Sequence, residues 1–158
     1  MTFFPAGRAG LSDGERGLVM AALAIAAVGA LTSLQVLRQI HVPLSGAAGL
    51  AWVLVVGALA LPAAGWLLRH NLGLTGLHGI ARAVLSLALI VPLSGLVGGT
   101  LLLPGHGTMF GPLATVLTVA GSPGLLALWA VAIAGLHLTV RAWRDERDSI
   151  FRVDLSRL

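Results

Sequence analysis

The sequence contains no cysteine and no lysine, and only 10% of its 158 residues are charged. Without cysteine the chain has no disulfide bond, thiolate metal site, iron–sulfur cluster or cysteine nucleophile. A water-soluble domain usually carries about a quarter charged residues, so the polar surface that such a domain needs is missing. These absences exclude thiol chemistry and argue against a soluble globular protein.

Long apolar runs fill the sequence instead, which is 57% hydrophobic with a mean hydropathy of +0.95. Four runs are separated by short polar or glycine- and proline-rich breaks, and they cover residues 17–40, 46–68, 78–103 and 123–144. Each is long enough to cross a hydrocarbon core of roughly 30 Å at about 1.5 Å per residue. We therefore predict an all-α polytopic membrane protein, a single transmembrane domain built as a bundle of four transmembrane helices.

Capping residues predict where these helices begin. Ser12 and Glu15 have the spacing of a capping box, in which each side chain bonds the backbone N–H of the other residue. Ser45 and Thr75 can cap the second and third helices. Ser122 precedes a proline, which is favoured at the first position of a helix, so we expect the fourth helix to begin there.

The segment 108–120 is apolar but too short to cross a bilayer. Gly111-Pro112 is expected to begin a short helix within it. Three arrangements fit: a helix lying at the membrane interface, a re-entrant half-helix, or an extension of the fourth helix across a kink.

The positions of the arginines predict the orientation. Arg38 alone falls between the first two runs, and the other nine fall on the opposite side by topology: Arg8, Arg16, Arg69, Arg82, Arg141, Arg144, Arg147, Arg152 and Arg157. Loops rich in arginine stay in the cytoplasm. We therefore expect both termini in the cytoplasm, and the absence of lysine points to a GC-rich bacterium and hence to its cytoplasmic (inner) membrane.

Each end of the chain allows a second interpretation. The first run, with the small residues Ala27–Ala30 in its second half, resembles the apolar part of a signal peptide with its cleavage site, but its length favours a retained helix. In the tail 145–158, the apolar residues Phe151, Leu155 and Leu158 share helical spacing. They predict a short amphipathic helix on the membrane surface, and a solvated tail is the alternative.

Reactive side chains are scarce in the apolar runs. All six acidic residues lie near the two ends of the chain, whereas ion-coupled transporters place an ionisable group at depth. Paired carboxylates, a zinc-binding helix and a glycine-rich phosphate loop are also missing. We therefore predict no catalytic residue and no metal site.

The five histidines are the remaining candidates for cofactor binding. His137 is the one inside a predicted span, and with His70 or His78 it could hold a b-type haem near the inner face. His41 and His106 would form an outer pair. The simpler interpretation is that these histidines lie at the interfaces and that His137 bonds a neighbouring helix, so we expect no cofactor.

A few residues within the runs predict helix packing or a polar path. Gly95-xxx-Gly99 is a pattern that lets another helix approach closely. The amide of Gln35 should face another helix or a wet cavity, because lipid offers it no hydrogen bond. Gln35, Ser94 and Thr108 are the candidates for a polar path.

Together these features favour a small inner-membrane protein without catalytic chemistry, an accessory, assembly or structural subunit of a membrane complex. Its expected partners are the lipid bilayer and other membrane proteins or further copies of itself. Nucleic acid is not expected, because the arginines form no stripe with interleaved aromatic residues. The alternatives are a small transporter or channel unit working as an oligomer, and a b-type haem-binding membrane protein.

Overall fold

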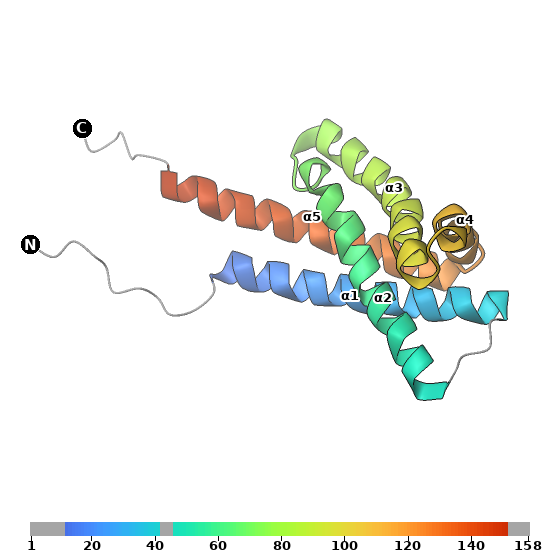
Figure 1. Ribbon diagram of the computed structural model, residues 1–158. Coiled ribbons are helices and arrows are strands. Elements are labelled where there is room, and N and C mark those ends of the chain that lie inside the picture. The colour runs from blue at the N-terminus through green and yellow to red at the C-terminus, as the bar shows by residue number, and fades with distance from the viewer. Residues whose placement is uncertain (1–11, 42–45, 152–158) are drawn as a thin grey trace, which may run out of the picture.

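The computed structural model describes residues 12–41 and 46–151, and these residues form helices and turns with no β-strand among them. The elements are α1 (Asp13–Ile40), α2 (Gly46–Leu67), the short 3-10 helix η1 (Arg69–Asn71), α3 (Gly76–Leu102), α4 (His106–Ala120) and α5 (Pro123–Phe151) (Figure 1). Four of these helices, α1, α2, α3 and α5, are long and apolar enough to cross a membrane. The predicted all-α fold is therefore confirmed.

The capping residues explain several helix boundaries. The capping box of Ser12 and Glu15 is present, so α1 begins ahead of its apolar run. Thr75 stands at the N-cap of α3, but its side chain makes no capping hydrogen bond. Ser45, proposed as a cap, and the apolar tail positions Leu155 and Leu158 lie outside the described residues.

Helix α5 continues beyond the end of its apolar run at residue 144. No glycine or proline interrupts the chain from residue 136 to 151, so the backbone has no reason to leave the helix there. Arg141 and Asp145, one turn apart, approach to 3.9 Å on its surface. Hydropathy marked the end of the apolar run, and helix propensity explains why the helix continues past it.

Helices α1 and α5 run antiparallel, so the first residues of α1 lie beside the last turns of α5 (Figure 1). One carboxylate oxygen of Glu146 accepts hydrogen bonds from the Gly14 amide at 3.0 Å and from the Ser12 hydroxyl at 3.2 Å. Further along the pair, the indole N–H of Trp129 donates to the Thr32 hydroxyl at 2.9 Å. These contacts join α1 and α5 at two separate levels.

Helix α2 crosses α1 where a glycine of each helix meets the other. A methyl group built on Gly29 or on Gly57 would overlap the backbone of the opposite helix, so only glycine allows the observed contact. Around this crossing lies the core, to which α1, α2, α3, α4 and α5 all contribute buried side chains, among them Ile25, Leu61, Ile90, Val119 and Trp129.

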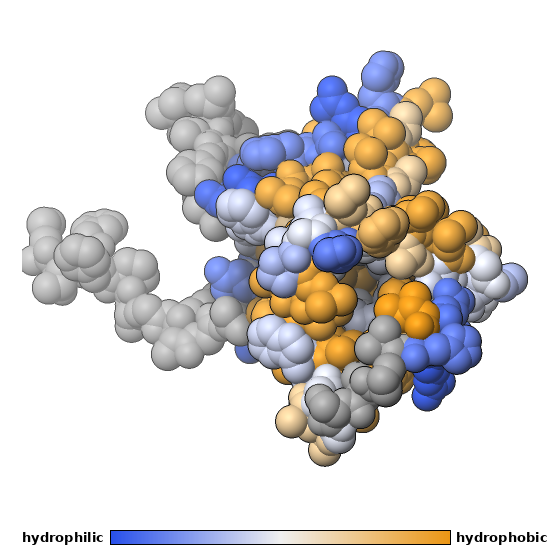
Figure 2. Space-filling model, turned by 45° about the vertical axis from the view of Figure 1, so that its right-hand side comes forward, coloured by the Kyte–Doolittle hydropathy of each residue, from blue (hydrophilic) through white to orange (hydrophobic). Residues whose placement is uncertain are grey.

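Large apolar side chains cover the outside of the bundle. Leu77 is 84% exposed, Met109 75% and Val131 70%. Figure 2 shows hydrophobic residues over most of the visible face and hydrophilic residues mainly at its margins. A soluble monomer rarely exposes apolar surface on this scale, whereas hydrocarbon solvates it at no cost.

Helix α4 begins at His106, five residues ahead of the expected start at Gly111-Pro112, and Pro112 lies inside it. The chain reverses at Gly105, whose φ of 87° lies in the left-handed region that glycine adopts readily. Gly121 and Ser122 separate α4 from α5, so α4 is a helix of its own and not the first part of α5. In Figure 1 it is seen almost along its axis, crosswise to α1 and α5.

Candidate functional site: an apolar cavity beneath α4

The cavity exists because α3 and α4 form a tight helical hairpin. The pattern Gly95-xxx-Gly99 on α3 faces a second one, Gly107-xxx-Gly111, on α4. A methyl group on any of the four glycines would overlap the opposite backbone, so the two helices touch along their main chains. Sequence reasoning missed the second pattern, because Gly107 lies in the break between residues 103 and 108 and Gly111 was assigned to a helix start.

Between this hairpin and the crossing of α1 with α2 lies a cavity of about 240 Å³. Its lining extends along α1 from Gly29 to Ile40, a distance of about 16 Å at about 1.5 Å per residue. Small residues make the room: Gly98 and Ala60, which pack against each other, line it from α3 and α2, and Ala114 lines it from α4. An engineered apolar cavity of about 150 Å³ takes up benzene, so this one is large enough for a ligand.

Three of the four hydroxyl side chains that line the cavity, Thr32, Ser94 and Thr115 but not Ser33, bond back to their own helices. Thr32, Ser94 and Thr115 donate back to carbonyl oxygens of their own helices, at 2.7, 2.8 and 2.9 Å. Thr32 also accepts the hydrogen bond from Trp129, which lies at the deep end. Among the described residues that line the cavity there is one histidine, His106, and no Asp, Glu or Arg. Apart from Ser33 and His106, the walls therefore present mainly carbon.

Such a cavity suits an apolar occupant better than water. A buried water needs two to four polar partners. Three of the four lining hydroxyls already donate to their own helices, which leaves Ser33 as the hydroxyl that could donate to a water. An apolar occupant would restore the missing dispersion contacts without losing hydrogen bonds.

The three residues predicted for a polar path occupy different places. Ser94 lines the cavity and Gln35 is not among the lining residues. The hydroxyl of Thr108 pairs with that of Thr100 at 2.9 Å, on the exposed side of the hairpin. The structure therefore does not bring Gln35, Ser94 and Thr108 together at one cavity.

Gln39, one helical turn after Gln35, makes the contact with another helix that was predicted for Gln35. The Thr118 hydroxyl donates to the side-chain carbonyl of Gln39 at 2.7 Å, which joins the end of α4 to the end of α1. The spacing of Gln35 and Gln39 by one helical turn was a visible signal for a polar face, but the sequence did not show which of the two meets a partner.

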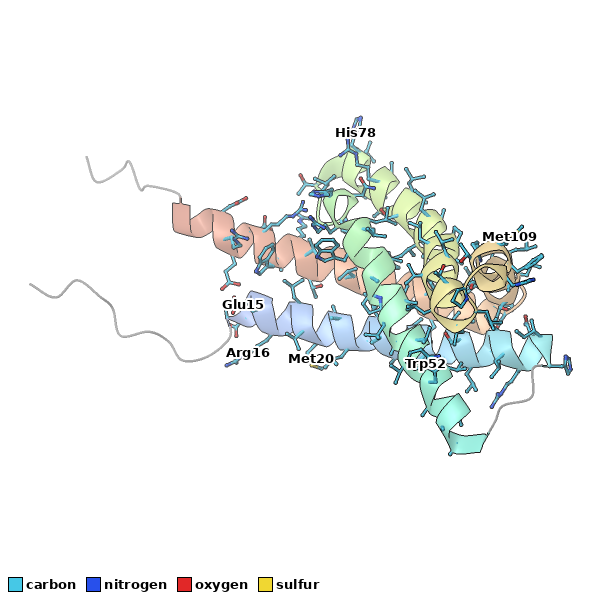
Figure 3. All side chains as sticks on the ribbon, in the orientation of Figure 1. Glu15, Arg16, Met20, Trp52, His78 and Met109 are labelled. Atoms are coloured by element: carbon cyan, nitrogen blue, oxygen red, sulfur yellow. The ribbon has the colours of Figure 1, made fainter. Side chains whose placement is uncertain are left out.

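His137, the one histidine predicted within a span, has a structural contact. Its Nδ1 accepts a hydrogen bond from the Gly73 amide at 3.1 Å, so the neutral ring carries its proton on Nε2 and has no lone pair left for iron. His70 and His78 are exposed, and His78 points outward from the start of α3 (Figure 3). The described residues include no group of three histidines or acids able to hold a metal ion.

Arginine and tryptophan side chains stack at the end of the bundle where the last turns of α5 lie. The guanidinium of Arg69 lies 3.8 Å from the centre of the Trp66 ring, and that of Arg147 lies 4.7 Å from Trp143. Arg144 donates to the Arg69 carbonyl at 3.3 Å, so η1 and α5 meet there. Cationic and indole groups together are typical of the membrane–water interface.

Comparison of the chain with protein-family models, with curated proteins and with solved structures found no match. Its function is therefore inferred from the residues and contacts described above.

Proposed function

We propose that this chain is a small multi-pass protein of the bacterial inner membrane, without catalytic chemistry, that serves as an accessory, assembly or structural subunit of a membrane complex. The distribution of ionisable groups carries the proposal. The described acidic residues lie in the first turn of α1 and the last turns of α5. His137, within α5, accepts a backbone hydrogen bond, which is a packing role.

The arrangement of the helix ends supports cytoplasmic termini. Glu146 accepts a hydrogen bond from Gly14, and Arg144 donates one to the carbonyl of Arg69. The start of α1, the last turns of α5 and the turn after α2 therefore lie at the same end of the bundle. The arginine-rich segments thus share one side, as the positive-inside rule requires of a cytoplasmic face. Arg38, near the end of α1, is the described arginine at the other end.

The small residues of the helices divide into two groups. Gly29, Gly57, Gly95 and Gly99 are used for contacts within the chain. Ala22 on α1 and Ala134 on α5 are exposed and leave room for a helix of another protein. The partner surface that we propose therefore lies on α1 and α5, away from the α3–α4 hairpin.

The two alternatives have weaker support. The cavity beneath α4 favours a transporter or channel unit in one respect, but its mainly apolar walls hold no carboxylate to bind a cation. A b-type haem on His137 would require breaking the hydrogen bond from Gly73 to free the ring for iron. A visible spectrum with a Soret band would revive the haem alternative.

The topology can be tested directly because the chain has no native cysteine. His78→Cys and Pro104→Cys each place one thiol at an exposed position at opposite ends of α3. A membrane-impermeant maleimide should label Pro104→Cys in intact cells, and His78→Cys only after the membrane is opened. Labelling of His78→Cys in intact cells would reverse the proposed orientation, and equal labelling of both would argue against a spanning α3.

The partner role is tested by purification in a mild detergent from the native host. We expect a membrane protein to co-purify in a fixed ratio. Ala22→Leu or Ala134→Leu should release it while the thermal stability of the chain itself is unchanged. Recovery of a monomer alone, after cross-linking in the membrane as well as without it, would refute the role as a subunit.

A further inference from the structure

We propose that the cavity beneath α4 is a lipid site that holds one acyl chain of a phospholipid. Occupancy by a lipid rests on the membrane location in the proposed function and is independent of the proposed partner.

The shape fits one extended hydrocarbon chain. The lining extends for about 16 Å along α1, yet the volume is about 240 Å³, so the cavity is narrow. An α-helix with its side chains is about 10–12 Å wide, which is too thick to enter so narrow a space along its length. A transmembrane helix of a partner or of a second copy would cover the mouth without filling the cavity.

The mouth and the floor can be told apart by exposure. Ile40, Leu103 and Phe110 line the cavity and are 53%, 60% and 59% exposed, so they mark an opening at the ends of α1 and α3. Leu61 and Trp129, each 1% exposed, mark the floor. A chain that enters beside α4 therefore ends against the indole of Trp129.

The walls select hydrocarbon over a polar ligand. The hydroxyls of Thr32, Ser94 and Thr115 donate to their own helices, and the glycines, alanines and larger apolar residues of the lining offer carbon and backbone. Ser33 adds a single further hydroxyl, which is too little to bind a polar ligand. His106, exposed at the mouth, is the polar side chain that a headgroup would meet. The bilayer surrounds this opening with acyl chains at very high local concentration, which favours a phospholipid as the source.

Trp129 provides the test, since it lies at the floor and is closed to the outside of the bundle. Replacing Trp52, Trp66 and Trp143 by phenylalanine leaves Trp129 as the single tryptophan of the chain. This variant is reconstituted in vesicles of phospholipid with brominated acyl chains, which quench indole fluorescence only on contact. We expect a loss of Trp129 fluorescence comparable with that of a single-tryptophan variant retaining Trp52, which is 54% exposed.

A matched pair of substitutions locates the quenching. Val36 lines the cavity, so Val36→Phe should fill it and restore Trp129 fluorescence. Val84, on α3, is 61% exposed, and Val84→Phe adds the same ring outside the bundle and should leave the quenching unchanged. Thermal melting of both variants verifies that each is folded.

The outcomes distinguish a failure of the proposed membrane location from a failure of the lipid site. If Trp52 is not quenched, the protein is not in the bilayer and the proposed membrane location fails. If Trp52 is quenched and Trp129 is not, the cavity holds no acyl chain and the lipid site is refuted. Quenching of Trp129 that persists in Val36→Phe would also refute it, because the bromine would then reach the indole by another route.

The source of the chain is identified by a second arm. Native mass spectrometry of the protein after exchange into detergent should show one retained adduct with the mass of a phospholipid, and Val36→Phe should lose it. Quenching by brominated free fatty acid, with an adduct of fatty-acid mass instead, would overturn the assignment to a phospholipid.

Discussion

Replacing Gly99 by alanine would place a methyl group on α3 where the backbone of α4 already lies. That methyl group would overlap the carbonyl group of Gly107, and a main-chain atom cannot turn away as a flexible side chain can. Helices α3 and α4 would therefore have to separate along their shared glycines. The neighbouring Gly98 is a matched control, because a methyl there lies at an ordinary 3.4 Å from the Cβ of Ala60.

The expected magnitude follows from two opposing effects. Alanine stabilises a helix interior by about 1 kcal/mol relative to glycine, and this gain is the same for both positions. Overpacking costs about 1–3 kcal/mol, and it applies at Gly99 alone. Gly98→Ala should therefore be neutral or more stable by up to about 1 kcal/mol, and Gly99→Ala should be less stable than Gly98→Ala by about 1–3 kcal/mol.

Thermal unfolding in detergent, followed by circular dichroism, measures this difference. For a chain of this size each kcal/mol corresponds to a shift in Tm of roughly 2–4 °C. The double variant Gly99→Ala with Gly107→Ala should lose less stability than the sum of the two single losses, because the first methyl has already separated the helices. Equal melting of Gly98→Ala and Gly99→Ala would show that α3 and α4 do not pack through their backbones.

Three further substitutions test contacts between other elements. Glu146→Gln keeps the shape of the side chain but removes the charge that caps the start of α1, so stability should fall by about 1 kcal/mol and hydrogen exchange of the Gly14 amide should rise. His137→Leu leaves the Gly73 amide without its acceptor and should cost about 1–3 kcal/mol, whereas a fully stable variant would contradict the structural role given to this histidine. Thr118→Val removes the hydroxyl that joins α4 to α1 and should lower stability by roughly 0.6 kcal/mol, with faster amide exchange confined to α4.

The helices could be predicted from the sequence because each depends on local patterns. Apolar runs of sufficient length identified four spans, and the capping box at Ser12 and the proline after Ser122 marked two starts. Hydropathy did not show that α5 continues past residue 144, because a helix can continue through polar residues after it emerges from the apolar part of the membrane. The start of α4 at His106 was missed because Pro112 was interpreted as a first position when it lies inside the helix.

The candidate site was much less accessible to sequence reasoning. The pattern at Gly95 and Gly99 predicted that some helix approaches closely, but not that α4 would supply it through Gly107 and Gly111. Gln35 stood out as a polar residue in lipid, yet Gln39 makes the contact with α4. Which of two similar residues finds a partner depends on the rotation of one helix against another, and no local pattern encodes that rotation.

By itself the sequence determined that the chain is helical and apolar, that its acidic residues are confined near its ends, and that its arginines are unequally distributed between the loops. These properties depend on composition and on the order of residues along one segment, so they do not require knowledge of the packing. Only the tertiary structure decided that α4 folds back on α3, and that this hairpin encloses a narrow cavity ending at Trp129. A cavity is the space that several helices leave unfilled, so its existence depends on their mutual placement and not on any one of them.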